Sequence, residues 1–157
     1  MNAQATVASL GNMKLFFDTT TRCFEEKDAA FAATPATFTV AQHIAHVAAT
    51  VDWFLEGAFR PQGFDMDFAA QEARVRQVTT LSDARAWWER SMANALRVLG
   101  SKTEAELAVP LPEDGIMGGV PRHAIVPGMA DHTAHHRGAL AVYARLLGKV
   151  PPMPYGG

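Results

Sequence analysis

The last helix that the sequence predicts carries two histidines on its apolar face. The residues that recur there at alternating spacings of three and four are Met129, His132, His136, Leu140, Tyr143 and Leu147. This spacing defines one face of a helix. A neutral imidazole on a core-facing stripe is costly unless its ring nitrogens are satisfied. Two imidazoles at positions i and i+4 can instead close on one side of a metal ion.

The HxxxH spacing alone does not decide between these two uses. It lacks the glutamate that supplies the general base in HExxH metalloproteases, and histidines on a helix face can also be hydrogen-bonded core residues. A third histidine in the same segment, His135, points about a quarter turn away. A second helix that bears histidines is therefore the observation that favours a metal site.

The spacing of apolar residues predicts three earlier amphipathic helices, over residues 3–24, 39–57 and 82–100. Residues 60–80, between the second and third helices, are long enough to form a crossover with one or two irregular helical turns. These elements predict an all-α four-helix bundle with a long crossover between helices two and three. We expect residues 1–157 to form a single domain, because this length suits one hydrophobic core.

Capping residues predict where several of these helices begin. The segment Thr39-Val40-Ala41-Gln42 has the form of a capping box, and Ser82 is expected to cap the third helix. Two starts remain open for the last helix. It begins either at Pro121, with a kink at Pro127, or afresh at Pro127 as its first helical residue. We expect it to end at Gly148.

Composition excludes several classes of protein. The chain is 48% hydrophobic and 19% charged, with a formal net charge of -2, so it has no surplus of basic residues for nucleic acid. With a single cysteine, Cys23, it can form no internal disulfide, and a reducing compartment suits it. It shows neither a signal peptide nor an apolar run long enough to span a membrane. We therefore expect a cytoplasmic protein.

The second predicted helix supplies further histidines. His43 and His46 are one turn apart on its flank and could both bind one ion. The flank also permits ordinary surface hydrogen bonding, which we expect for His43. His46 together with His132 and His136 would supply three imidazole nitrogens from facing helices. Three protein ligands leave positions open, as in catalytic rather than structural zinc sites.

Three segments resemble one known family. They are the second-helix segment FTVAQHIAHV at 38–47, the segment HTAHHRG at 132–138, and the ending LGKVPP with PYG at 147–156. Their order and spacing resemble those of the DinB-like (DinB/YfiT) family of metal-dependent enzymes over nearly the whole chain. Carried over by position, the resemblance makes His46, His132 and His136 the metal ligands.

The resemblance also implies what such a site would do. Family members are left-handed four-helix bundles, often homodimers, that bind nickel, zinc or iron. Some relatives use a low-molecular-weight thiol, such as bacillithiol or mycothiol, in transfer, hydrolytic or isomerase reactions. We therefore expect a metal-dependent enzyme that acts on a small-molecule substrate as a thiol-dependent S-transferase or a hydrolase. The alternative is a non-catalytic metal-binding or stress-associated bundle protein.

Four residues near these segments invite specific expectations. Asp131 could accept a hydrogen bond from an imidazole. Arg137 could hold an anionic substrate or form a salt bridge with a nearby carboxylate. Cys23 is expected to be an unreactive packing residue. The tail, residues 150–157, should lie extended across another helix, anchored by Tyr155.

Overall fold

The computed structural model describes residues 2–113 and 115–155. These residues form helices and connections with a single isolated β-bridge between Pro110 and Pro121 and no strand, which confirms the all-helical prediction. The elements in chain order are α1 (Ala3–Thr21), the 3₁₀ turn η1 (Glu26–Asp28), α2 (Val40–Phe59), α3 (Phe68–Arg76), α4 (Leu81–Gly100), α5 (Glu104–Ala108), the 3₁₀ turn η2 (Arg122–Ala124) and α6 (Ile125–Leu146).

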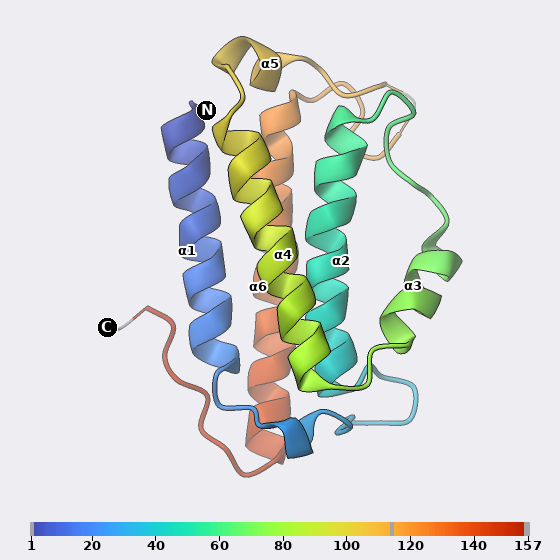
Figure 1. Ribbon diagram of the computed structural model, residues 1–157, viewed down its shortest axis with the longest axis vertical. Coiled ribbons are helices and arrows are strands. Elements are labelled where there is room, and N and C mark those ends of the chain that lie inside the picture. The colour runs from blue at the N-terminus through green and yellow to red at the C-terminus, as the bar shows by residue number, and fades with distance from the viewer. Residues whose placement is uncertain (1, 114, 156–157) are drawn as a thin grey trace.

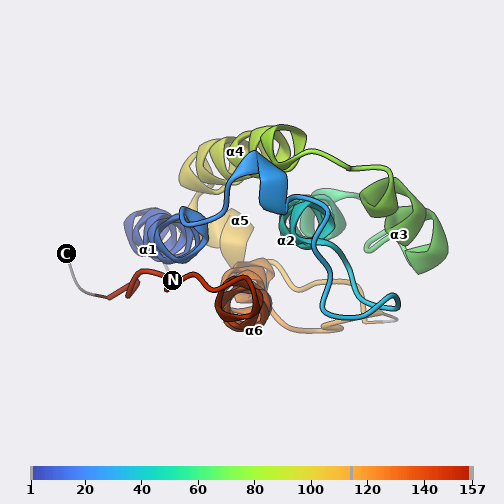
Figure 2. The ribbon, with the colours of Figure 1, turned by 90° about the horizontal axis from the view of Figure 1, so that it is seen from below.

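The four long helices, α1, α2, α4 and α6, lie side by side along the long axis of the molecule (Figure 1). Seen end-on in Figure 2, they occupy four corners, and α3 lies outside α2. Both α1 and α2 pack against α4 and α6. Among the described residues, no helix combines the length and the apolar character that crossing a membrane requires.

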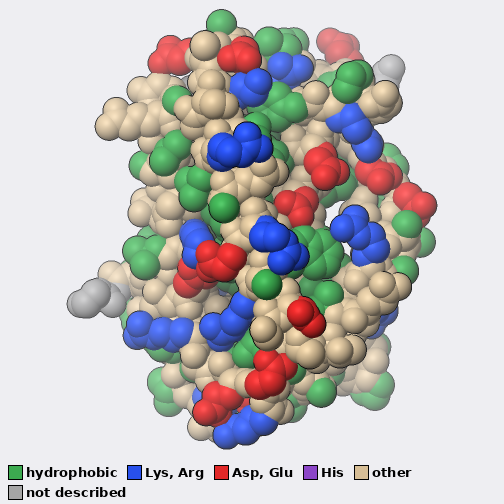
Figure 3. Space-filling model, in the orientation of Figure 1, with side chains coloured by type: hydrophobic (Ala, Val, Ile, Leu, Met, Phe, Trp, Pro, Cys, Tyr) green, Lys and Arg blue, Asp and Glu red, His purple; other side chains and the backbone are tan. Residues whose placement is uncertain are grey.

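The core forms where the apolar stripes of these helices meet. The apolar stripes of the second and third long helices are buried, namely Val40, Ile44, Val47, Val51, Phe54 and Ala58 on α2, and Leu81, Ala84, Trp88, Met92, Ala95 and Leu99 on α4. Full burial of each large apolar side chain stabilises the fold by about 1.5–3 kcal/mol. On the opposite surface of α4, Figure 3 shows basic and acidic side chains interspersed.

The predicted cap of the third helix was wrong. Helix α4 begins at Leu81, and its cap is Thr80, whose hydroxyl accepts a hydrogen bond from the backbone N–H of Asp83. The carboxylate of Glu26 accepts from the backbone N–H groups of Leu81 and Ser82 at 2.8 and 3.1 Å. Glu26, more than fifty positions away in the chain, therefore satisfies N–H groups of the first turn of α4. A local capping rule considers only residues next to the helix start and cannot predict this contact.

The last long helix also begins differently from both predicted alternatives. The turn η2 leads directly into α6 at Ile125, so Pro127 is the third helical residue. Proline is tolerated there because the N–H groups of the first turn have no partner within the helix. The end is as predicted. Gly148 has a φ of +73°, and the backbone N–H of Lys149 donates to the carbonyl of Ala144 at 2.8 Å, as in a Schellman motif.

Two helical glycines should respond oppositely to alanine. A Cβ atom on Gly57 would overlap the ring of Phe64, whereas one on Gly11 would meet nothing within 4 Å. We expect Gly57→Ala to lower the free energy of unfolding by about 1–3 kcal/mol through overpacking. Gly11→Ala, the matched control, should raise it by about 0.5–1 kcal/mol through helix propensity. Urea denaturation measures the free energy of unfolding of both variants. A change of the same sign in both would contradict the packing at Gly57.

Candidate metal centre

The start of α2 fixes which side of the helix carries its histidines. The predicted capping box is confirmed: the Thr39 hydroxyl accepts from the backbone N–H of Gln42 at 3.2 Å, and the Gln42 side-chain oxygen accepts from the backbone N–H of Thr39 at 3.1 Å. His43 and His46 follow within the first two turns. Helix α6 packs against this part of α2 and brings its own pair of histidines to it.

His46, His132 and His136 come together between α2 and α6. One ring nitrogen from each lies within 4.8 Å of those of the other two, and all three residues are half-buried. The Nε2 atoms of His132 and His136 are 3.1 Å apart. Two imidazole nitrogens bound to one ion at 2.0–2.1 Å and at common angles would lie about 3–3.4 Å apart. The arrangement therefore fits a divalent metal ion.

The expectation that His43 makes ordinary surface hydrogen bonds was wrong. The residue is 7% exposed, and its Nε2 lies 2.7 Å from Nδ1 of His136. The rings of Phe38 and Tyr143 meet it nearly edge to face, with centroids 6.2 and 5.4 Å away. Helix α6 and the segment before α2 cover the flank that the periodicity of α2 alone places at the surface.

The contact between His43 and His136 couples the tautomers of the two rings. A neutral imidazole carries one N–H, so one of the facing nitrogens donates and the other accepts. His136 can offer a lone pair at Nε2 only when its proton is on Nδ1, which then donates to Nε2 of His43. The proton of His43 is then on its own Nδ1, which is buried without a hydrogen-bond partner.

Burial keeps the imidazoles of His43, His46, His132 and His136 neutral. It lowers the pKa of His43 to about 4, and the neighbouring His46 and His135 lower it further in the same direction. Burial, followed by the other histidines, lowers the pKa of His132 to about 4 and that of His136 to about 2. Burial also lowers the pKa of His46, opposed by the charge of Glu72. Neutral rings have the free lone pairs that a metal ion needs.

These shifts predict acid sensitivity of the metal-free protein. In the unfolded chain the imidazoles titrate near 6.5, whereas His43 and His132 stay neutral in the fold down to about pH 4. The unfolded chain therefore binds more protons below about pH 6.5, and the free energy of unfolding falls as the pH is lowered towards about 4. Urea denaturation at about pH 7 and at about pH 4 measures this fall in the free energy of unfolding.

A variant with glutamine at the three clustered histidines serves as the control for that measurement. Its free energy of unfolding should depend less on pH, because three of the four shifted groups are gone. A wild-type free energy of unfolding that stays constant from about pH 7 to about pH 4 would contradict the burial of these rings.

Of the other residues singled out in the sequence, Asp131 and Arg137 lack the partners within the protein that were considered for them, whereas Tyr155 and Cys23 behave as expected. His135 and Asp131 are exposed, and no hydrogen bond within the described parts of the chain joins Asp131 to an imidazole. Arg137 has no carboxylate partner there either. It donates instead to the hydroxyl of Tyr155 at 2.7 Å, which anchors the tail as predicted. Cys23 is half-buried, and burial raises the pKa of its thiol, as suits a packing residue.

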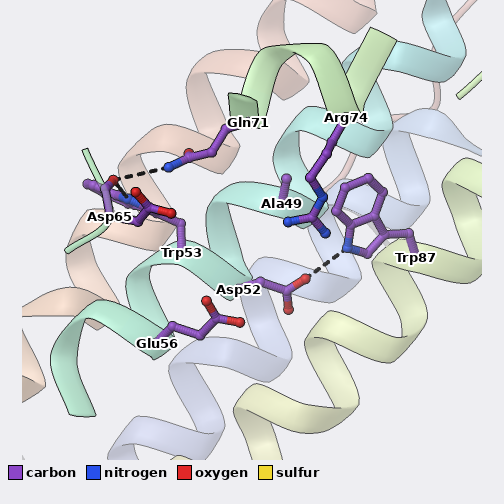
Figure 4. A pocket seen from close by; sticks show the side chains of 8 residues that line it. All are labelled: Ala49, Asp52, Trp53, Glu56, Asp65, Gln71, Arg74 and Trp87. Atoms are coloured by element: carbon purple, nitrogen blue, oxygen red, sulfur yellow. Dashed lines mark hydrogen bonds between the residues drawn. The ribbon is translucent and has the colours of Figure 1, made fainter. Parts of the chain in front are cut away.

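A small cleft opens between α2, α3 and α4 (Figure 4). It has a volume of about 70 Å³ and is lined by Ala49, Asp52, Trp53, Glu56, Asp65, Gln71, Arg74 and Trp87. Ala49 and Trp53 follow His46 by three and seven positions, so they lie on the same face of α2, one and two turns further along. The surface between α2 and α3 is visibly hollowed in Figure 3.

Hydrogen bonds hold the walls of this cleft. The indole N–H of Trp87 donates to Asp52 at 2.8 Å, and that of Trp53 donates to the backbone oxygen of Asp65 at 2.7 Å. The guanidinium of Arg74 lies 5.3 Å from the centre of the Trp87 ring. The sequence marks Asp65 and Arg74 only as charged residues of the crossover. Both are exposed, and the crossover brings the backbone oxygen of Asp65 to the indole N–H of Trp53 and the guanidinium of Arg74 over the ring of Trp87.

Comparison with known proteins gives one result that covers most of the chain. No match was found among curated proteins. The profile of the DinB family matches residues 26–157, a range that includes α2 and α6 with His43 and the three clustered histidines, and also the tail. The chain therefore belongs to the DinB family.

Proposed function

We propose that this protein is a metal-dependent enzyme whose ion is held by His46, His132 and His136. The observation that carries the proposal is the convergence of three neutral imidazoles, with one nitrogen of each within 4.8 Å of the others. Family membership supports it. The scaffold we infer is a four-helix bundle of α1, α2, α4 and α6, with α3 in the crossover between the second and third of these helices.

Three imidazole ligands suit nickel, zinc or iron. They would leave positions open on the ion, as in catalytic sites. An ion held there would lower the pKa of a bound water or of a low-molecular-weight thiol, so that a nucleophile exists at neutral pH. The protein's own contribution is to keep the three rings neutral and oriented. His43 fixes the tautomer of His136, and the helices fix the spacing of the three nitrogens.

We further propose that the cleft between α2, α3 and α4, whose α2 wall includes residues on the same helix face as His46, takes a polar part of a small-molecule substrate. Its α2 wall carries the carboxylates of Asp52 and Glu56, and its α3 wall carries the guanidinium of Arg74 (Figure 4). Charges of both signs on opposite walls can orient a substrate that bears an amino or a carboxylate group. The reaction class we propose is thiol-dependent S-transfer or hydrolysis.

The function is tested with the metal-loaded protein against a panel of electrophiles with added bacillithiol or mycothiol, and against a panel of esters. We expect turnover in one of the two panels, and its loss in His46→Ala. The variant Arg97→Gln, altered on an exposed part of α4, is the matched control and should retain turnover. A loaded wild-type protein that turns over nothing would identify it as a non-catalytic metal-binding protein.

A further inference from the structure

Arg137 is a half-buried cation without an anionic partner. None of the ion pairs within residues 2–113 and 115–155 includes it. Its guanidinium lies 5.7 and 5.2 Å from the ring centres of Phe16 and Tyr155, and its Nη2 donates to the neutral Tyr155 hydroxyl at 2.7 Å. Its Nη1 is buried and has no hydrogen-bond partner in the part of the chain that the structure describes. Buried cations are normally paired with an anion.

Two cavities meet at this residue, in a groove between α1 and α6. The first, of about 270 Å³, lies beneath Tyr155, and the second, of about 510 Å³, lies beneath residues 150–154 of the tail. Both are lined by Arg137 and Ala134. Most of the remaining wall is apolar and includes Met13, Phe16 and Ala130 in the first cavity and Ala141, Val150 and Met153 in the second.

Each cavity also borders a buried hydroxyl that lacks a partner. Thr133 lines the first cavity and is 2% exposed, and Thr20 lines the second and is 4% exposed. Neither hydroxyl makes a hydrogen bond within residues 2–113 and 115–155. More than nine in ten buried polar groups in proteins have a partner. Three unpartnered polar groups along one apolar groove therefore indicate a ligand with a polar group and an apolar body.

The groove is separate from the histidine cluster. Thr133 and Arg137 each follow a clustered histidine by one position, so their side chains are turned by about 100° around α6. The histidines contact α2, whereas Arg137 contacts Phe16 of α1. A ligand in the groove would therefore meet a different flank of α6 from the one that faces the metal centre.

We propose that this groove binds a small amphipathic carboxylate, a molecule with one carboxylate and an apolar chain or ring. The carboxylate would pair with the guanidinium of Arg137, and the apolar part would lie along Met13, Ala134 and Phe16. A carboxylate oxygen makes a charge-assisted hydrogen bond about twice as strong as the bond to the neutral phenol of Tyr155. The groove calls for a single negative charge. Its other basic residue, Arg145, is exposed to solvent and therefore needs no anionic partner.

Titration calorimetry with octanoate and with octanol tests the proposal, since the two probes share an apolar chain and differ in charge. We expect saturable binding of one octanoate per chain, and affinity for octanol weaker by at least about tenfold. Arg137→Gln should lower affinity for octanoate by at least about tenfold and leave octanol binding nearly unchanged. Arg97→Gln removes a distant surface cation and should bind octanoate as the wild type does.

A second variant keeps the proposal testable if Arg137→Gln does not fold. Ala134 is exposed and lines both cavities, so Ala134→Phe should fill the groove and abolish binding of both probes without unfolding the protein. Wild-type protein that binds no octanoate, or binds octanol equally well, would overturn the proposal. So would loss of octanoate binding in His46→Ala, because that result would place the carboxylate at the metal centre.

Discussion

Replacing His136 by alanine is expected to abolish stoichiometric metal binding, and His46→Ala and His132→Ala should have the same effect. Each variant removes one of the three nitrogens that lie within 4.8 Å of one another. Two imidazoles rarely hold a divalent ion in competition with solvent, whereas three are the usual minimum for a catalytic site. Elemental analysis of protein purified without a histidine tag measures the metal content directly.

Thermal unfolding gives a second measure of the same loss. A ligand present at about a hundred times its dissociation constant stabilises the folded state by about 2.7 kcal/mol. Added metal should therefore raise the melting temperature of the wild-type protein and leave those of the three variants unchanged. His135→Ala is the matched control, because His135 is exposed and outside the cluster although it adjoins His136. Equal metal content in His46→Ala and the wild type would refute the assignment of the ligands.

Replacing His43 by phenylalanine is expected to weaken metal binding by about 10–100-fold, the usual effect of losing a residue that orients a ligand. Phenylalanine preserves the aromatic packing against Phe38 and Tyr143. It cannot accept the hydrogen bond that holds the proton of His136 on Nδ1 at a separation of 2.7 Å. Competition with a chelator of known affinity measures the change.

His43→Gln should recover part of the lost affinity, because its amide oxygen can accept the bond that phenylalanine cannot. Nitrogen NMR shifts of the metal-free protein report the tautomer independently of metal affinity. They should show His136 protonated on Nδ1 in the wild type, and a mixture of tautomers in His43→Phe. Unchanged metal affinity in a folded His43→Phe variant would show that the hydrogen bond does not orient the ligand.

Local rules predicted the parts of this fold that depend on single helices. The stripe from Val40 to Ala58 is buried because a period of 3.6 residues places those positions on one face, whatever lies opposite. The capping box at Thr39 formed because both its bonds lie within four residues. The same periodicity indicated that His132 and His136 share a face, and the structure brings His46 to them.

The predictions that were wrong at Ser82 and His43 concern contacts between elements. Ser82 is a plausible cap by sequence, but Thr80 caps α4 and Glu26 of η1 satisfies the next donors. His43 was expected at the surface, because its position on α2 does not show that α6 covers that flank. The salt bridge expected for Arg137 does not form within the described residues, where its guanidinium donates to the Tyr155 hydroxyl instead; its pairing with an anionic substrate stays a prediction.

The sequence by itself determined the helices, their apolar faces and the residue types that can bind a metal, because each depends on the chemistry and spacing of nearby residues. Only the tertiary structure decided which nitrogens face one another, which rings lose their water and which charges lack a partner. Those properties depend on distances between segments far apart in the chain. The 2.7 Å contact between His43 and His136, which are 93 positions apart, is the clearest case. No local pattern encodes such a contact, because it arises only when two helices pack.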